Sequence, residues 1–218
     1  MKKITILFLA VFFTTITFSQ NSEKAKNLLD EVSTKMGAYK NMYIRFSQTL
    51  SNEEAGINEG DEPPIRGAIN LQGEKYNLNY LGNQFIYDGT RLHVINHEEK
   101  EISITDGDLG EDDGFVYPSK LLSFYKEGYN YNMGKLENTK GRSIQYVTLN
   151  PIDSNSEIVK VELAIDAKTK HIYKLIQTGE NGSKTTFTID QFKKNEDLSP
   201  NFFQVNKEKY LNQNYTID

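Results

Sequence analysis

The sequence contains no cysteine and no tryptophan, and it has only 5 prolines in 218 residues. Without cysteine, no disulfide, thiolate zinc site, iron–sulfur cluster or cysteine nucleophile is possible. Basic residues number 25 against 30 acidic ones, a balance that argues against a nucleic-acid-binding protein, whose surface is basic. Beyond the N-terminus, no stretch approaches the roughly 20 apolar residues of a membrane span. The 37% of hydrophobic residues is ordinary for a folded protein.

The first 19 residues have the pattern of a secretory signal peptide. Lys2 and Lys3 precede an apolar run, and small residues at Thr17 and Ser19 suit a cut before Gln20. A retained membrane helix is the alternative interpretation, although the run is short for it. We therefore expect a signal peptide over residues 1–19, cleaved near Ser19/Gln20, a single domain over residues 20–218, and a periplasmic location.

Apolar spacing predicts two helices and a long series of strands. The apolar residues of 22–39 recur every three or four positions, which predicts an amphipathic helix capped by Ser22. A second helix is predicted over residues 118–127, and residues 198–205 are predicted to form a turn of helix and a closing strand. The remaining pattern alternates with period two and predicts strands. Their ranges are 42–50, 65–71, 75–80, 84–87, 91–96, 99–105, 129–136, 142–150, 157–165, 171–178 and 184–192.

Tight turns determine how these strands pair. Asp88-Gly89 and Asn181-Gly182 are strong hairpin signals, and strands joined by such turns are antiparallel. So long an antiparallel sheet must curl to bury one face. Two helices are too few to cover it from outside, so we expect them to lie across its mouth or inside its concave face.

Aromatic residues are abundant, with 13 tyrosines and 12 phenylalanines. Ordinary core packing accounts for any one of them. Together, a curved sheet lined with aromatic and aliphatic side chains under helices can leave a groove for an apolar ligand. At roughly 0.8 kcal/mol per methylene, an acyl chain of about fifteen methylenes would gain on the order of 12 kcal/mol on burial.

The polar motifs give little indication of catalysis or metal binding. His93 and His97 would lie roughly 13 Å apart on a strand, which is too far for one metal ion. The acidic segment from Asp106 lacks the glycine and glutamate positions of an EF-hand calcium loop. Ser123 and Lys126 have an S-x-x-K spacing without the partner motifs of acyl enzymes, so a hydrolase remains a minor alternative. We expect no enzyme activity, no metal and no cofactor.

Several short motifs, taken in order, resemble those of the LolA-type outer-membrane lipoprotein carriers over nearly all of residues 20–218. Leu28-Leu29 lie in the N-terminal helix, and Phe46-Ser47-Gln48 match the F-x-Q strand of the family. Gly67 opens the next strand, and Asp88-Gly89-Thr90-Arg91-Leu92 match its D-G-x-x-L hairpin. The others are Pro118-Ser119-Lys120-Leu121-Leu122 in the lid helix, Leu149-Asn150-Pro151 as L-x-P, and Gly182 before the late strand.

The resemblance implies a mainly β fold with an α-helical lid. The implied fold is a single-domain unclosed antiparallel β-barrel of about eleven strands, with lid helices over a hydrophobic cavity. The implied function is a periplasmic chaperone that carries acylated lipoproteins from an inner-membrane LolCDE-type ABC transporter to an unidentified outer-membrane acceptor. The alternative is a LolA-like module that senses lipid or lipoprotein without transporting it. We expect a monomer and no nucleic-acid partner.

Candidate residues follow from the apolar faces of these elements. The expected cavity residues are Ile44, Phe46, Ile69, Leu71, Tyr76, Leu78, Phe85 and Leu92. The expected lid residues are Leu28, Leu29, Val32, Leu121, Leu122 and Phe124. The choice of inward face is open, because a one-residue slip inverts a strand. Gly73-Glu74 stand where family members often carry an arginine–proline pair that tethers the lid, so the resemblance does not identify a latch in this protein.

Overall fold

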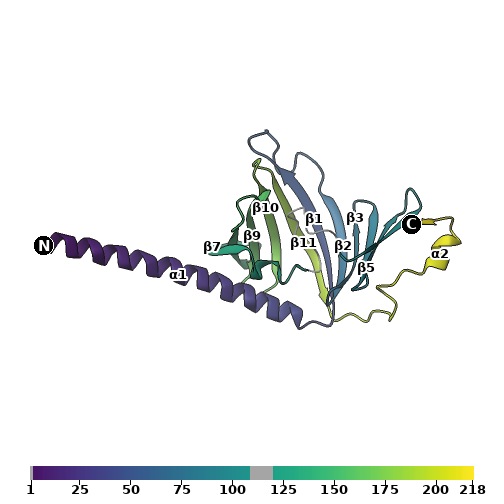
Figure 1. Cartoon of the computed structure of the whole chain (residues 1–218), viewed down its shortest axis with the longest axis horizontal. Coiled ribbons are helices and arrows are strands. Elements are labelled where there is room, and N and C mark those ends of the chain that lie inside the picture. The colour runs from purple at the N-terminus through teal and green to yellow at the C-terminus, as the bar shows by residue number, and fades with distance from the viewer. Residues whose placement is uncertain (1, 109–119) are drawn as a thin grey trace.

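A curved sheet of twelve strands is the main feature of the computed structural model, which describes residues 2–108 and 120–218, with side chains from residue 20 onward (Figure 1). The first half contains α1 (Lys2–Gly37), β1 (Met42–Ser51), β2 (Ile65–Gln72), β3 (Lys75–Tyr80), β4 (Asn83–Tyr87), β5 (Arg91–Asn96) and β6 (Glu101–Asp106). The second half contains the 3-10 helix η3 (Phe124–Lys126), β7 (Tyr129–Thr139), β8 (Arg142–Pro151), β9 (Ile158–Asp166), β10 (Ile172–Gly179), β11 (Lys184–Lys194), α2 (Lys207–Leu211) and β12 (Thr216–Ile217).

The strand order confirms an unclosed antiparallel barrel. The order is β12-β6-β5-β4-β3-β2-β1-β11-β10-β9-β8-β7, so β1 pairs with β11 near the middle and the two halves extend in opposite directions. All neighbours are antiparallel except β12, which pairs parallel to β6. The order is linear, so within the described residues β7 and β12 are edge strands that do not pair with each other.

Helix α1 packs against one face of the sheet, which we call the concave face. Its C-terminal half lies beside the strands, while its N-terminal half projects past the sheet (Figure 1). The helix ends at Gly37, two residues before the end of the predicted range, and it does not begin at Ser22. No proline or glycine interrupts residues 2–36, so the helix continues through Ser22 and needs no cap there. None of the helices in the described residues has both the length and the apolar character that a membrane crossing requires.

The predicted second helix is wrong for the residues that the structure describes. Residues 120–126 form turns and the short helix η3, and Pro118 and Ser119 of the predicted range lie outside the described residues. The Tyr131 hydroxyl donates to the backbone carbonyl of Tyr125 at 2.6 Å, and Gly128 has a positive φ of 82°. Both features end the helical turn before α-helical hydrogen bonds accumulate.

The C-terminal segment also differs from the prediction. Residues 198–205 contain turns and no strand, the helix is α2, and the closing strand is β12. Asn206 accepts a hydrogen bond from the backbone N–H of Lys209, so the helix begins only after this cap. The segment covers the convex face of β4–β6, where Ile86, Ile95 and Ile102 form a second, smaller core.

Candidate apolar binding face

All fourteen predicted cavity and lid residues belong to one hydrophobic cluster between α1 and the concave face. The buried members are Leu28, Leu29, Val32, Ile44, Ile69, Leu71, Tyr76, Leu78 and Leu92, and the half-buried members are Phe46, Phe85, Leu121, Leu122 and Phe124. The structure therefore brings the candidates together in one cluster. Their role in binding a ligand stays a prediction.

Strand register explains how these residues share a face. Directly opposed residues of antiparallel strands point to the same side. Ile44 lies opposite Ile69, which lies opposite Leu78, and Leu78 lies opposite Phe85. In the next row, Leu71 lies opposite Tyr76. All the cavity candidates except Phe46 thus lie in two adjacent apolar rows that cross β1–β5.

A third row contains aromatic side chains and a glycine. Phe46 lies opposite Gly67, and its ring lies so close that a Cβ on Gly67 would be 2.3 Å from the ring carbon Cζ. The Phe46 ring centroid is 5.8 Å from the rings of both Tyr80 and Phe187. The Tyr80 hydroxyl donates to the side-chain oxygen of Gln48. All three aromatic rings stay partly exposed, so this row forms an open, apolar end of the cluster.

Helix α1 contributes a buried stripe and a few polar ties. Ala25, Leu29 and Met36 are at most 1% exposed against the sheet. At its N-terminal side, the Asn21 side chain accepts from the backbone N–H of Met133 at 2.7 Å. Lys170 pairs with Glu31 at 2.7 Å, but the glutamate is more than half exposed, and such pairs contribute little. The apolar stripe therefore provides most of the attachment of α1.

Each of the two described parts of the segment between β6 and β7 is held by a hydrogen bond between a tyrosine and a carboxylate. The Tyr76 hydroxyl donates to Asp108 at 2.6 Å, and burial followed by this carboxylate raises the pKa of Tyr76. The Tyr125 hydroxyl donates to Asp30 of α1 at 2.8 Å, and burial and this contact raise the pKa of Tyr125 to about 12. Two tyrosine–carboxylate bonds thus connect the segment to the sheet on one side and to α1 on the other.

Half of the concave face comes from β8–β10 and was not among the residues predicted from the sequence. Its buried residues are Val147, Leu149, Val161, Leu163, Ile165, Ile172 and Leu175. The same alternation that predicted the strands could have identified them, since these residues recur with period two in β8 and β9. The candidate residues for the cavity came from β1–β5 alone.

The polar candidates lie apart from one another. His93 is buried on β5, whereas the exposed His97 forms a 3.0 Å hydrogen bond with the Tyr215 hydroxyl. The Ser123 hydroxyl donates to the carbonyl of Lys120. In the described ranges, no three His, Asp or Glu side chains gather closely enough to hold a metal ion.

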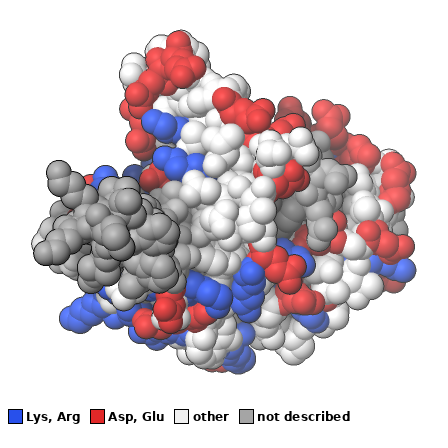
Figure 2. Space-filling view, turned by 60° about the vertical axis from the view of Figure 1, so that its left-hand side comes forward, with Lys and Arg blue, Asp and Glu red and all other residues white. Residues whose placement is uncertain are grey.

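Charge is distributed unevenly around the face. Figure 2 shows an uncharged area in the middle of the view, with acidic side chains above it and mostly basic ones below. The loop between β1 and β2 contributes exposed acidic residues, which are Glu53, Glu54, Glu59, Asp61 and Glu62. The middle of this side therefore offers few charged groups to a ligand.

Comparisons with known proteins found similarity at the level of structure only. No protein-family model matches the sequence, and no curated protein matches it. An uncharacterised conserved protein from Thermus thermophilus is 9% identical, with a TM-score of 0.57 over 84% of this protein and 93% of that one.

Two further solved structures have lower TM-scores of 0.43 each. A LolA-superfamily protein from Nitrosomonas europaea is 11% identical over 84% of this protein and 98% of that one. The Mycobacterium tuberculosis lipoprotein LppX is 14% identical over 80% of this protein and 98% of its own length. At 9% identity, the likeness to the Thermus protein establishes that the open sheet with its packed helix is a shared fold.

Proposed function

We propose that this protein is a periplasmic carrier that binds the acyl chains of lipoproteins between α1 and the concave face and delivers them to the outer membrane. The observation that carries the proposal is an apolar face whose rim is incompletely covered. Phe46, Tyr80, Phe85 and Phe187 pack on the buried cluster yet stay partly exposed. These four rings form a partly exposed aromatic surface that is continuous with the buried cluster under α1.

The energetics suit reversible binding. Four α1 side chains, Leu28, Leu29, Val32 and Met36, are buried against the sheet. At about 1.5–3 kcal/mol each, their burial contributes about 6–12 kcal/mol. One acyl chain of about fifteen methylenes contributes on the order of 12 kcal/mol on burial. The two contributions are of similar size, so exchange of α1 for an acyl chain on the concave face is about neutral or modestly favourable before ordering costs. Helix α1 returns when the lipid is released.

The carrier proposal includes a source and a destination for the cargo. The motif resemblance supports receipt from an inner-membrane LolCDE-type ABC transporter and delivery to an outer-membrane acceptor. A signal peptide over residues 1–19 would place the domain 20–218 in the periplasm, where both membranes are accessible. No catalytic step and no cofactor is needed for this exchange.

Lipid binding is tested by expressing the protein with its signal peptide and examining it by native mass spectrometry. The expected result is a species carrying diacyl or triacyl mass. Phe46→Glu places a charge in the apolar row and should abolish this species, whereas Leu211→Glu on the exposed surface of α2 should retain it. Circular dichroism confirms that both variants fold. Retention of lipid by a folded Phe46→Glu variant would remove Phe46 from the site.

Transport is tested with inner-membrane vesicles that carry a newly made lipoprotein. The carrier proposal predicts ATP-dependent release of the lipoprotein into the soluble fraction when the protein is added, followed by transfer to outer-membrane vesicles. Tight binding without transfer would contradict the carrier role and favour a lipid or lipoprotein sensor.

A further inference from the structure

A second candidate site lies where β10 and β11 separate. Their ladder ends at the pair Lys174 and Thr188, although both strands continue. Each strand has one extra residue at this point. Tyr173 has no partner in β9, because Ile172 pairs with Ile165 and Lys174 pairs with Ala164.

The matching irregularity in β11 is Asp190. Phe46 of β1 pairs with Ile189 and Arg45 pairs with Gln191, so Asp190 is the extra residue. β-bulges bend a strand and increase its twist, and they occur often beside functional sites. Here two bulges face each other in neighbouring strands, and the strands diverge beyond them.

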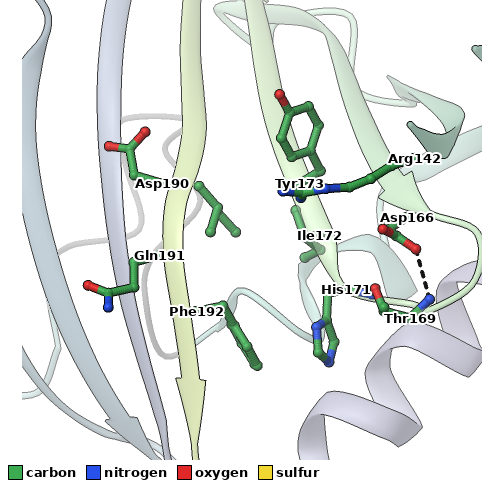
Figure 3. Close-up of a pocket in the computed structure, with 10 residues that line it drawn as sticks. Arg142, Asp166, Thr169, His171, Ile172, Tyr173, Asp190, Gln191 and Phe192 are labelled. Atoms are coloured by element: carbon green, nitrogen blue, oxygen red, sulfur yellow. Dashed lines mark hydrogen bonds between the residues drawn. The ribbon is translucent and has the colours of Figure 1, made fainter. Parts of the chain in front are cut away.

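The divergence leaves a cavity of about 270 Å³ (Figure 3). It is lined by residues of β8, β10, β11 and the β9–β10 turn, including Arg142, Ile172, Tyr173, Ile189 and Phe192. Since a water molecule occupies about 30 Å³ of the liquid, the volume corresponds to roughly nine waters. This is the size of a small organic molecule.

One cation faces this cavity. The Arg142 guanidinium lies 5.4 Å from the centroid of the Tyr173 ring, and Figure 3 shows it extending across Ile172 and Tyr173 toward the gap. Asp166 accepts hydrogen bonds from the backbone N–H groups of Lys168 and Thr169, so its carboxylate holds the β9–β10 turn. None of the ion pairs between described residues involves Arg142, although the burial of the nearby Asp166 is outweighed by backbone hydrogen bonds and the Arg142 charge, which together lower its pKa.

The opposite wall is aromatic and aliphatic. The rings of His171 and Phe192 lie 4.3 Å apart at 36°, and the His171 ring also bonds to the Tyr39 hydroxyl at 2.8 Å. Burial, with the charges of Lys35 and Lys194, lowers the pKa of His171. The ring is therefore neutral at pH 7, and Arg142 supplies the positive charge. Figure 3 shows the side chains of Asp190 and Gln191 turned away from the gap, toward β1.

We propose that this gap binds a small organic carboxylate, with the carboxylate on Arg142 and its apolar body against Phe192 and Ile172. Guanidinium binds carboxylate through two parallel hydrogen bonds, which gives both strength and orientation. The gap borders the proposed acyl-chain site, because Ile172, Ile189 and Phe192 also belong to the concave-face cluster, but the proposal does not depend on the proposed function. The carboxylate could belong to a free acid or to the C-terminus of a short peptide, since the same group is recognised in both.

Binding is tested by NMR titration of the ¹⁵N-labelled protein with three probes, phenylacetate, isovalerate and the peptide Ala-Ala-Phe. The neutral amides of the same three compounds serve as matched controls. At least one acid should shift the backbone amides of residues 171–173 and 189–192, and its amide should bind at least ten-fold more weakly. Binding of phenylacetate or isovalerate identifies a free acid, and binding of the peptide alone identifies a peptide C-terminus.

Three variants separate the Arg142 charge from general surface charge. Arg142→Gln should weaken binding at least ten-fold, and Arg142→Lys should weaken it several-fold because the bidentate geometry is lost. Arg91→Gln removes an exposed arginine paired with Asp106 on β6 and should leave binding unchanged. The proposal is overturned if none of the acids shifts these amides at millimolar concentration, if amides bind as well as acids, or if Arg142→Gln binds like the parent.

Discussion

The contact between Phe46 and Gly67 gives a prediction that tests the aromatic row by its packing. In Gly67→Ala, the new methyl group would lie 2.3 Å from Cζ of Phe46 and 2.8 and 2.9 Å from the two adjacent ring carbons. The φ of Gly67 lies outside the left-handed region, so alanine meets no backbone strain at this position. The whole penalty must therefore come from the displaced ring.

The magnitude follows from what the ring loses. Overpacking of this kind costs about 1–3 kcal/mol, and each of the two aromatic contacts of Phe46 is worth about 0.5–1.5 kcal/mol. Because Phe46 is half-buried and can rotate outward, we expect Gly67→Ala to lower the free energy of unfolding by about 1–2 kcal/mol. Urea denaturation of the purified protein, monitored by tyrosine fluorescence, measures this difference.

A double-mutant cycle separates the ring clash from any other effect of the methyl group. In a Phe46→Ala background, Gly67→Ala should cost nothing, or stabilise by up to about 1 kcal/mol, because alanine reduces the entropy of the unfolded state. An equal penalty in both backgrounds, or a Gly67→Ala variant as stable as the parent, would refute the packing assigned to this row.

Three further predictions concern the lid, the histidine beside the gap and the convex core. Tyr125→Phe removes the hydrogen bond to Asp30, so stability should fall by about 1 kcal/mol in urea unfolding while lipid exchange becomes faster in stopped-flow measurements. The lowered pKa of His171 means that the unfolded state binds a proton more readily. Stability should therefore fall as pH decreases below about 6.5, and His171→Phe should flatten urea midpoints between about pH 7 and pH 5. Ile95→Ala in the convex core should cost about 2–5 kcal/mol and leave the lipid stoichiometry of the folded protein in native mass spectrometry unchanged.

Period-two alternation predicted the strands well where one face is apolar. The range of β3 was predicted with its observed bounds, and alternation grouped Ile44 with Phe46 and Ile69 with Leu71, but it left open which face was the inward one. These features are local, because successive side chains of a strand point to opposite faces whatever the rest of the protein does. The curling of the sheet then followed from the number of strands and the tight turns between them, whereas its unclosed form was implied only by the motif resemblance.

The convex core could not be predicted from period-two alternation. β4 and β5 have apolar residues on both faces, with Phe85 beside Ile86 and Val94 beside Ile95. Alternation alone does not show which of two apolar neighbours is covered by a distant segment. The cover consists of a five-residue helix and a two-residue strand that pairs with β6, and neither is long enough for a periodic signal.

The gap between β10 and β11 was also beyond prediction from the sequence. Its existence depends on single extra residues at Tyr173 and Asp190, and these are defined only by the pairing of each strand with its other neighbour. Tyrosine is common in strands, and aspartate, although depleted in strands, does not by itself indicate an extra residue at position 190. Arg142 comes close to them only through the pairing of β8 with β9.

The most direct test of an acyl-chain site on the concave face is paramagnetic broadening by a fatty acid with a spin label near its methyl end. The two cores have separate isoleucine methyl groups that report on the two faces. Binding on the concave face predicts strong broadening of Ile44 and Ile69, with Ile86, Ile95 and Ile102 unaffected. Broadening confined to the second group, or absent from both while the lipid is bound, would contradict the account.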